Sequence, residues 1–563
     1  MASLPPFVIF FLGAALVAVA DGRLRSAILL AVPVLGAVNL LGLADGAGYS
    51  FGFLDYTLTL VRVDKLSFLF GLLFHLAAFI AIVFALRVDD RVQHVSALLY
   101  AGAALGAVFA GDLITLFLFW EVLAVTSAFL ILARRTERAT RAALRYLTIQ
   151  VSAGVMLLAG VLMHLDRTGS IAFDFIGLDG PGSWLIFLAF GVKAAFPFLH
   201  NWLTDAYPEA TPTGTVFLSA FTTKVAVYAL ARGFPGTELL VYIGATMTMF
   251  PIFFAVIEND LRRVLGYSMI NQIGFMVCGI GLGTELAVNG AVSHAFNDVI
   301  FKALLFMSMG AVLFRTGKIN GSELGGLYKS MPLTAGLCIV GAASISAFPL
   351  FSGFVSKSMV MVAALEEGHP IVWLALLFAS AGVFHHAGIK IPFFAFFAHD
   401  SGIRVREAPP NMLIAMALAA FVCIFNGVYP WALYSLLPFP VDYVPYTAEH
   451  VLTQTQLLFF SALAFTWLKL TGLYPPELPG INIDAEWLYR RVAPAAARGV
   501  AAAAVAFRQA VVAGAAATAG RLVGAVYRYG GPAGILGRSW PTGSMAFWAT
   551  LLLAAYLLLY YFG

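Results

Sequence analysis

Apolar stretches long enough to cross a membrane dominate this chain. Its 563 residues are 61% hydrophobic and only 11% charged, which no soluble domain of ordinary composition matches. Hydropathy separates about sixteen stretches of roughly 20 residues, the length that a hydrocarbon core of ~30 Å requires of a helix. The sequence therefore predicts an all-α polytopic membrane protein. The expected spans are 5–21, 25–43, 65–87, 95–111, 112–133, 142–165, 184–207 (broken), 211–233, 238–258, 264–283, 286–314, 332–364 (broken), 371–397, 411–430, 452–470 and 545–562, with Asp112 capping the fifth.

The basic residues indicate an orientation. Most of the 33 lysines and arginines fall in loops that share one side of the membrane if the N-terminus lies outside. This pattern predicts a multi-pass protein in the lipid bilayer of a bacterial cytoplasmic (inner) membrane. Five lysines fall inside the expected spans instead: Lys193, Lys224, Lys302, Lys357 and Lys390.

The stretch from Trp184 to Arg232 carries two of these lysines, Lys193 and Lys224, on either side of a polar turn. A lysine at the centre of a span costs at least ~2.5–3.5 kcal/mol on insertion scales, so it normally faces a wet or protein interior and has a function. Pro197 lacks an amide proton and crowds the carbonyl of Lys193, four residues back. We therefore expect a broken helix that lines a cavity. The alternative is a simple kink beside a lysine that reaches the surface.

A short repeat indicates internal symmetry. The sequence Ala195-Phe196-Pro197 recurs as Ala347-Phe348-Pro349, again with a lysine nearby, Lys357. Five expected spans separate the two prolines, so the two broken helices would cross in opposite directions, as in inverted repeats. The predicted organisation is N-terminal helices (1–111), a first repeat (112–233, with part of the preceding helix), a second repeat (238–397), peripheral helices (411–470), a lateral region (473–544) and a last span (545–563).

The region 473–544 is rich in alanine with widely spaced arginines. It is too apolar for a solvated linker and too charged for a comfortable span. We expect an amphipathic helix along the inner membrane face, tethered by the last span. The alternative is two further transmembrane helices. Residues after Gly472 are expected to add surface to the protein and no group to its interior.

Several polar groups lie within the spans. Glu121 is isolated in an apolar run, so its carboxylate needs a cation or a proton, and Lys193 is the natural partner. An intramembrane Glu/Lys pair that can open would act as a proton switch.

His294, Asp298 and Lys302 recur every four residues and share one helix face, which suits a water-linked relay. Asp298 is expected to pair with Lys302. The alternative for this row is a polar packing seam. Of the tandem histidines near Lys390, His385 and His386, one is expected to face inward. No metal-ligand spacing, cofactor motif or nucleic-acid-binding pattern is found in the sequence, and it predicts no cofactor, no metal and no nucleic-acid partner.

These residues resemble a known family. Phe119–Glu121, the stretch around Lys193 and Pro197, FTTKVAVYALAR with Lys224, HAFNDVIFKALLFMSMG with Lys302 and FPLFSGFVSKSMV with Lys357 are similar to the antiporter-like subunits. That family comprises proton-pumping subunits of respiratory complex I and membrane-bound hydrogenases, and the A and D subunits of Mrp-type cation/proton antiporters, with the core motifs most similar to the D type.

The resemblance covers about residues 60–430 and implies two inverted five-helix repeats around a hydrated polar axis. It implies that Glu121 and Lys193 form the switch, that Lys224 and Lys302 continue the relay, and that Lys357 is its last lysine. Asp298 departs from the family, which often has a histidine there.

The expected function is translocation of protons, or of protons and sodium, by a subunit of a multi-subunit cation/proton antiporter. The alternative is the same role in a redox-driven complex, as part of an NADH:quinone oxidoreductase-like translocase. The expected partners are other membrane subunits of an Mrp-type or complex I-like assembly. The chain itself is expected to carry no catalytic chemistry. A membrane scaffold without transport would leave five intramembrane lysines unexplained.

Overall fold

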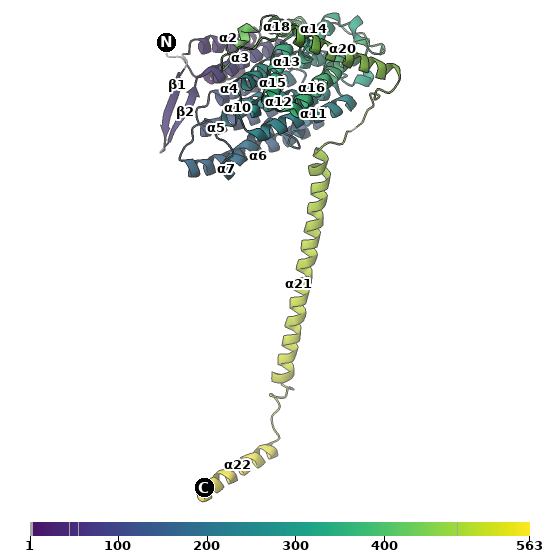
Figure 1. The fold of residues 1–563 in the computed structure, drawn as a ribbon. Helices are drawn as coiled ribbons and strands as arrows, with labels where there is room; N and C mark the ends of the chain where they lie inside the picture. The colour runs from purple at the N-terminus through teal and green to yellow at the C-terminus, as the bar shows by residue number, and fades with distance from the viewer. Residues whose placement is uncertain (1–3, 44–45, 55, 481) are drawn as a thin grey trace. The chain divides into compact units, whose positions relative to one another are not determined.

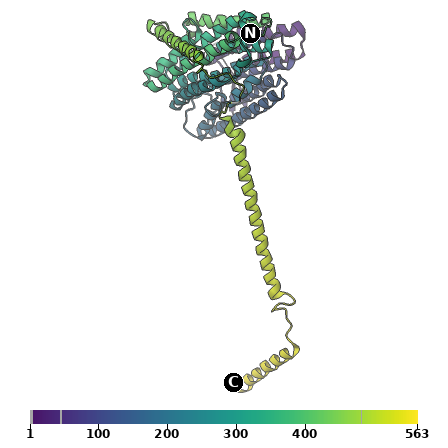
Figure 2. The same cartoon turned by 90° about the vertical axis from the view of Figure 1, so that its right-hand side faces the viewer.

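The computed structural model describes residues 4–43, 46–54, 56–480 and 482–563, and the chain divides into two compact units, Met1–Asn482 and Ile483–Gly563. The predicted domain 1–111 therefore includes six residues outside the described part, and the predicted domain 473–544 includes one. The first unit is a bundle of closely packed helices, seen from two directions in Figures 1 and 2.

The first unit begins with helices and a β-hairpin. Its elements are α1 (Pro6–Val19), α2 (Gly22–Leu41), β1 (Gly48–Phe53), β2 (Tyr56–Arg62), α3 (Lys65–Ala85), α4 (Arg91–Phe109), α5 (Leu113–Leu132), α6 (Glu137–Thr168), α7 (Pro181–Lys193), α8 (Asn201–Ala206), η1 (Tyr207–Glu209), α9 (Gly214–Ala220) and α10 (Thr222–Gly233). Its later elements are α11 (Glu238–Ile257), α12 (Leu261–Leu282), α13 (Glu285–Thr316), η2 (Gly321–Glu323), η3 (Leu327–Lys329), α14 (Pro332–Ile345), α15 (Ser352–Glu366), α16 (Pro370–Val383), η4 (Phe384–Ile389), α17 (Lys390–Pro392), η5 (Phe393–Phe397), α18 (Pro410–Val428), α19 (Trp431–Tyr434) and α20 (Ala448–Leu470).

The predicted fold class is confirmed, because the chain is a polytopic all-α membrane protein with almost no sheet. Among the described residues, 14 helices are long and apolar enough to cross a membrane. All but one of them coincide with expected spans. The three remaining expected spans contain shorter apolar helices, α1, α7 and α14. The long helix outside the expected spans lies in the second unit.

The hairpin of β1 and β2 was not expected. The strands pair antiparallel, with Gly48 opposite Arg62 and Phe53 opposite Tyr56. The hairpin is joined to the bundle through Asp112, whose Oδ2 accepts a hydrogen bond of 2.7 Å from the Thr59 amide. Asp112 also caps α5, as expected, by accepting from the Thr115 amide.

Two stretches of the chain repeat the same local structure. Asp112 caps α5 and forms an isolated bridge with Ala172, while Asp260 caps α12 and forms one with Asn320. Both α6 and α13 are 32 residues long, and each ends in a left-handed glycine. These features are a local repeat, and the inverted arrangement of the two stretches stays a prediction. The boundaries of the repeats stay a prediction.

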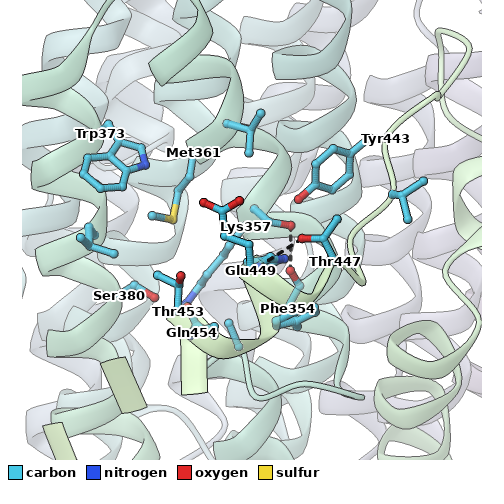
Figure 3. A pocket seen from close by; sticks show the side chains of 16 residues that line it. Phe354, Lys357, Met361, Trp373, Ser380, Tyr443, Thr447, Glu449, Thr453 and Gln454 are labelled. Carbon is cyan, nitrogen blue, oxygen red and sulfur yellow. Dashed lines mark hydrogen bonds between the residues drawn. The ribbon is translucent and has the colours of Figure 1, made fainter. Parts of the chain in front are cut away.

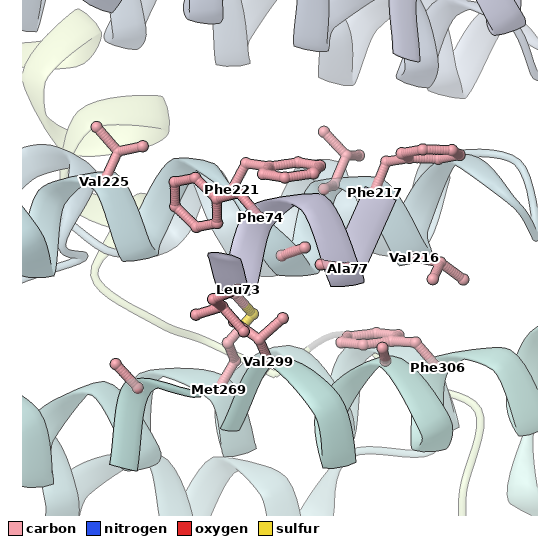
Figure 4. Close-up of a cluster of buried hydrophobic side chains, with 14 of the residues drawn as sticks. Leu73, Phe74, Ala77, Val216, Phe217, Phe221, Val225, Met269, Val299 and Phe306 are labelled. Atoms are coloured by element: carbon pink, nitrogen blue, oxygen red, sulfur yellow. The ribbon is translucent and has the colours of Figure 1, made fainter. Parts of the chain in front are cut away.

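The core lies where α9 and α10 meet α12 and α13. The helices of the first predicted repeat, which end with α9 and α10, and those of the second, which include α12 and α13, are called here the two halves of the bundle. Side chains from α3, α9, α10, α12 and α13 gather there, and Phe74 of α3 packs edge-on against Phe221 at the start of α10, with ring centroids 5.2 Å apart (Figure 4). Inside a membrane such packing is stabilised by van der Waals contact, since lipid tails are as apolar as the side chains. This core fixes α10 against α13, and these two helices carry the central charges.

The second unit consists of η6 (Leu488–Val492), α21 (Ala493–Gly530) and α22 (Thr542–Phe562). Helix α21 is one continuous helix of 38 residues, about 57 Å long at 1.5 Å per residue. The alternative of two separate spans in this region is therefore not found. Helix α22 coincides with the expected last span, and the placement of α21 along the inner face stays a prediction.

Candidate functional site

Both broken helices end in the same hydrogen-bonded cap. In the first, α7 ends at Lys193, Ala195 adopts a left-handed φ of 62°, and the Phe196 amide donates to the carbonyl of Gly191. In the second, α14 ends at Ile345, and Ala347 repeats the conformation with a φ of 58°. This is the Schellman cap, in which glycine is the usual left-handed residue.

The cap shows that distortion of the helix by Pro197 is not what ends α7. The helix has already ended before Pro197, so the proline prevents its continuation and does not distort its interior. Pro349 stands at the same place after α14. Both predicted breaks are present at the expected residues.

Lys193 is fully buried at the end of α7. Its Nζ donates a hydrogen bond of 2.9 Å to the carbonyl of Trp120 and lies 4.5 Å from the centre of the Trp120 ring. Glu121 follows Trp120 on α5. Among the described residues Glu121 forms no ion pair, and its Oε1 is buried without a hydrogen bond, against Gly154 of α6. The structure thus brings Glu121 near Lys193 with the expected ion pair unformed.

Lys224 and Asp298 form the central charge pair. Lys224 Nζ on α10 lies 2.6 Å from Asp298 Oδ2 on α13, and both side chains are 0% exposed. Among the described residues neither carboxylate oxygen of Asp298 accepts a hydrogen bond, so the ion pair is its one polar contact. The expected pairing of Asp298 with Lys302 is wrong, because Asp298 turns toward the other half of the bundle.

Lys302 and His294 point to other elements. Lys302 Nζ donates to Ser268 Oγ of α12 at 2.6 Å, while His294 Nδ1 lies 3.0 Å from Ser356 Oγ of α15. Asp298 still attracts the charge of Lys302, whereas Lys224 and Lys357 repel it. The row on α13 is therefore one polar face whose members each meet a different helix.

Lys357 joins the two halves of the second broken helix. It lies on α15, and its Nζ donates at 2.6 Å to the carbonyl of Ile345, the last residue of α14. Its charge also lies 5.2 Å from the centre of the Phe275 ring. A cation at a helix C-terminus is stabilised by the unpaired carbonyls there.

A cavity of about 350 Å³ reaches Lys357 (Figure 3). Phe354 and Trp373 supply part of its apolar wall, and Glu449 and Gln454 of α20 are among its polar side chains. The ring of His450 stacks on Phe354 with centroids 4.1 Å apart. Sequence reasoning missed this cavity, since α20 had been expected only as a peripheral span.

Lys390 lies at the other end of the row, between two π-helical segments, η4 and η5. Its neighbour His386 is 0% exposed, whereas His385 is only partly buried and stacks on Tyr474. One of the tandem histidines thus faces inward, as expected. Single π-helical turns inside α-helices often occur at functional sites.

Sequence reasoning also missed Glu477. It follows α20 in a proline-containing loop, yet its Oε1 forms an ion pair of 2.9 Å with Lys390 Nζ and its side chain is only 5% exposed. The expectation that residues after Gly472 add only surface is therefore wrong. Hydropathy could not reveal Glu477, because the segment around it is too short to span and is interrupted by three prolines.

The fold and this site define a polytopic membrane protein with two broken helices and a buried row of charges between its halves. Residues 110–383 match the family described as NADH:quinone oxidoreductase/Mrp antiporter, transmembrane region.

Curated relatives agree with this assignment. The chain is 31% identical to the D-type Na(+)/H(+) antiporter component of Alkalihalophilus pseudofirmus over 316 residues, 52% of this chain and 64% of that protein. It is 26% identical to hydrogenase-4 component B of Escherichia coli over 506 residues, 80% of this chain and 73% of that protein. The chain covers between a third and two thirds of the length of several curated relatives that it matches.

A solved structure shares the fold. A chain of the Mrp complex from Dietzia sp. DQ12-45-1b superposes with a TM-score of 0.70 at 22% identity, over 82% of this chain and 98% of that chain. At this identity the likeness shows the fold alone.

Proposed function

We propose that this chain is a proton-translocating membrane subunit of a multi-subunit cation/proton antiporter. The observation that carries the proposal is the buried ion pair of Lys224 and Asp298, which joins the two halves of the bundle at their core. A buried pair is weak evidence for stability, because its desolvation offsets much of its attraction. Charges retained at membrane depth are functional by default.

The first step of the mechanism belongs to Glu121 and Lys193. When the Glu121 carboxylate approaches, it stabilises the protonated Lys193. When it turns away, the ammonium of Lys193 is left with the Trp120 carbonyl and ring and releases its proton more readily. The arrangement with the ion pair unformed is the second of these states. Glu121, Trp120 and Lys193 together therefore act as a switch at one end of the axis.

Lys224 and Asp298 carry out the next proton transfer. A proton that Lys193 releases toward Lys224 adds positive charge beside Lys224, which favours proton loss toward Asp298 and Lys302. Lys302 hands the proton on through Ser268 and neighbouring water, and the Ser268 hydroxyl can both accept and donate. Each transfer moves one proton from an ammonium or carboxylic acid to the next base, so charge and atoms balance along the row.

Lys357 connects the axis to the cavity beside α20. This cavity is roomy enough for several water molecules and has polar side chains from Glu449 and Gln454. In the orientation proposed here, with the N-terminus outside and the chain in a bacterial cytoplasmic membrane, the cavity is the proton route between Lys357 and the outer surface.

A second candidate is the same role in a redox-driven complex. Of the two curated relatives described above, the one that matches the larger share of this chain is a hydrogenase component. In such a complex other subunits would carry out the electron transfer, and this chain would move protons. In either case its partners are other membrane subunits, with protons, and sodium in an Mrp-type antiporter, as the transported ions.

The test is proton movement in inside-out vesicles that contain the assembled complex. We expect sodium addition to dissipate a preformed pH gradient with the wild-type chain, and Glu121→Gln and Lys193→Ala to abolish this while assembly is retained. An unchanged signal from correctly assembled Lys193→Ala complexes would contradict the switch. Proton movement that responds only to an electron donor, and not to sodium, would favour the redox-driven role.

A further inference from the structure

We propose that Glu477 is the inner terminal group of the proton path, exchanging protons between Lys390 and the inner surface. This inference rests on the proposed function and extends it to a segment outside the matched domain. The segment is Leu473–Gly480, called here the closing segment, which follows α20. Neither Glu477 nor Lys390 lies within the residues 110–383 that match the family.

The surroundings of Lys390 show why Glu477 is needed. Lys390 Nζ donates at 2.6 Å to the carbonyl of Val256 and at 2.6 Å to that of Glu258, at the C-terminal end of α11. Glu477 Oε1 lies 2.9 Å from the same nitrogen. An ammonium has three donors, and these three oxygens can satisfy all of them. The carbonyls are fixed parts of a helix end, so Glu477 is the member of this set that can change its charge.

Glu477 is held loosely enough to exchange a proton. Among the described residues no group donates a hydrogen bond to either oxygen of its carboxylate, apart from the ion-pair contact with Lys390. Burial raises the pKa of Glu477 above its usual value, and the charge of Lys390 opposes this shift. Charged and neutral forms are therefore closer in free energy than for a solvated carboxyl.

Other titratable groups also surround the pair. Lys469 and Glu258 act on Glu477, and Arg263 lies 4.0 Å from Glu258. On the other side, His385 stacks on Tyr474. These groups set the local field, but their side chains make no contact with Lys390 Nζ comparable with that of Glu477.

The closing segment is fixed to two helical elements, η4 and α20. The ring of Tyr474 stacks on His385 of η4 and packs against Phe465 of α20, with centroids 5.5 Å and 5.1 Å apart. Just beyond the segment, Asn482 Nδ2 donates to Glu258 Oε2 at 3.2 Å. These contacts hold Glu477 over Lys390 with both carboxylate oxygens buried and the side chain only 5% exposed, so water must enter to take up its proton.

The proposed step is a proton transfer in two stages. The ammonium of Lys390 gives a proton to the Glu477 carboxylate, which leaves a neutral amine and a neutral acid. Glu477 then releases the proton to water, and Lys390 regains one from the His386 side of the axis. His386 fits this role because it is fully buried and lies four residues before Lys390. The reverse order carries a proton inward to the axis.

The experiment compares Glu477→Gln, Glu477→Asp and the control Glu323→Gln in the assembled complex. Glu323 is a matched carboxylate near the same face that pairs with Lys318 at 3.7 Å, and both of those side chains are well exposed. We expect Glu477→Gln to reduce proton movement about tenfold or more, because glutamine keeps the shape but cannot carry a proton, as expected for loss of a proton-transfer group. Glu323→Gln should transport normally.

Glu477→Asp separates a proton-carrying role from a merely structural one. Its shorter side chain keeps the carboxyl but weakens contact with Lys390, so we expect partial transport with a shifted pH profile. Transport by Glu477→Gln at the wild-type rate and pH profile would overturn the inference. If Glu477→Gln does not assemble, an unshifted profile and full rate in Glu477→Asp would overturn it. Absence of proton movement in the wild type and in Glu323→Gln would instead contradict the proposed function.

Discussion

Lys224 of α10 and Asp298 of α13 form an ion pair of 2.6 Å in which neither side chain is exposed. Removing one partner of a buried pair costs about 3–5 kcal/mol, since the other charge is left without compensation. In Asp298→Asn the remaining hydrogen bond of Lys224 is a long one of 3.4 Å to the Ser219 carbonyl. We therefore expect the thermal unfolding midpoint of the purified complex to fall and proton movement to stop.

The double variant Lys224→Gln/Asp298→Asn is the control for this prediction. It removes both charges, so we expect it to recover much of the lost stability but none of the transport. A double variant as unstable as Asp298→Asn would show that the two charges are not coupled. Normal transport in Asp298→Asn would show that the proton path bypasses the pair.

Gly154 of α6 makes room for the carboxylate of Glu121. A β-carbon at position 154 would overlap Glu121 Oε1, so Gly154→Ala forces the carboxylate away from its present site. We expect the variant to assemble and its rate of proton movement to change by about tenfold, equivalent to about 1.4 kcal/mol in the barrier. Gly336→Ala is the control, because no atom lies within 4 Å of the added carbon. Equal rates in both variants would contradict a role for the position of Glu121.

Much of the axis could be predicted from the sequence, because a charge in an apolar span is conspicuous. Lys193, Lys224 and Lys302 were identified in this way, and all three are buried. The partner of Asp298 could not be predicted from spacing on one helix. A carboxylate on α13 can turn toward Lys302 or toward α10, and only the packing of the core decides between them.

Glu477 and the hairpin were missed for a different reason. Both lie in short segments between spans, where hydropathy carries no information about position. Glu477 becomes buried only because Tyr474 and its neighbours fix the closing segment against η4 and α20. Such contacts depend on elements far apart in the sequence.

Two shortened chains test whether the closing segment contributes to the stability of the first unit. A chain that ends at Asn482 keeps the whole first unit, whereas one that ends at Gly472 loses Tyr474 and Glu477. We expect both shortened chains to bind neighbouring subunits more weakly in blue-native electrophoresis, because both lack α21. Only the chain that ends at Gly472 should also lose thermal stability of its own helices. Equal unfolding midpoints for the two would contradict a structural contribution from the closing segment.

Asp64, which lies outside the spans, makes a pH-dependent contribution to the stability of the fold. Its carboxylate caps α3 and accepts two hydrogen bonds from the Arg232 guanidinium, at 2.7 Å and 2.8 Å. Burial raises the pKa of Asp64, but Arg232 and the Ser67 amide more than offset this, and the pKa lies below its usual 3.8. A depressed carboxyl pKa stabilises the fold above the pKa of the unfolded chain, and this contribution is lost as pH falls through the folded value.

Asp64→Asn keeps a capping side chain but removes the charge. We expect it to cost about 1.5 kcal/mol at neutral pH, the lower end for a hydrogen bond to a charged group. The difference in unfolding midpoint between wild type and variant should be constant from neutral pH to about pH 5 and should shrink below about pH 4, as the wild-type carboxylate takes up a proton. The measurement is thermal unfolding of the purified complex across a pH series. A difference that persists unchanged at the lowest pH would show that the charge of Asp64 contributes nothing, and that the asparagine variant is destabilised by shape alone.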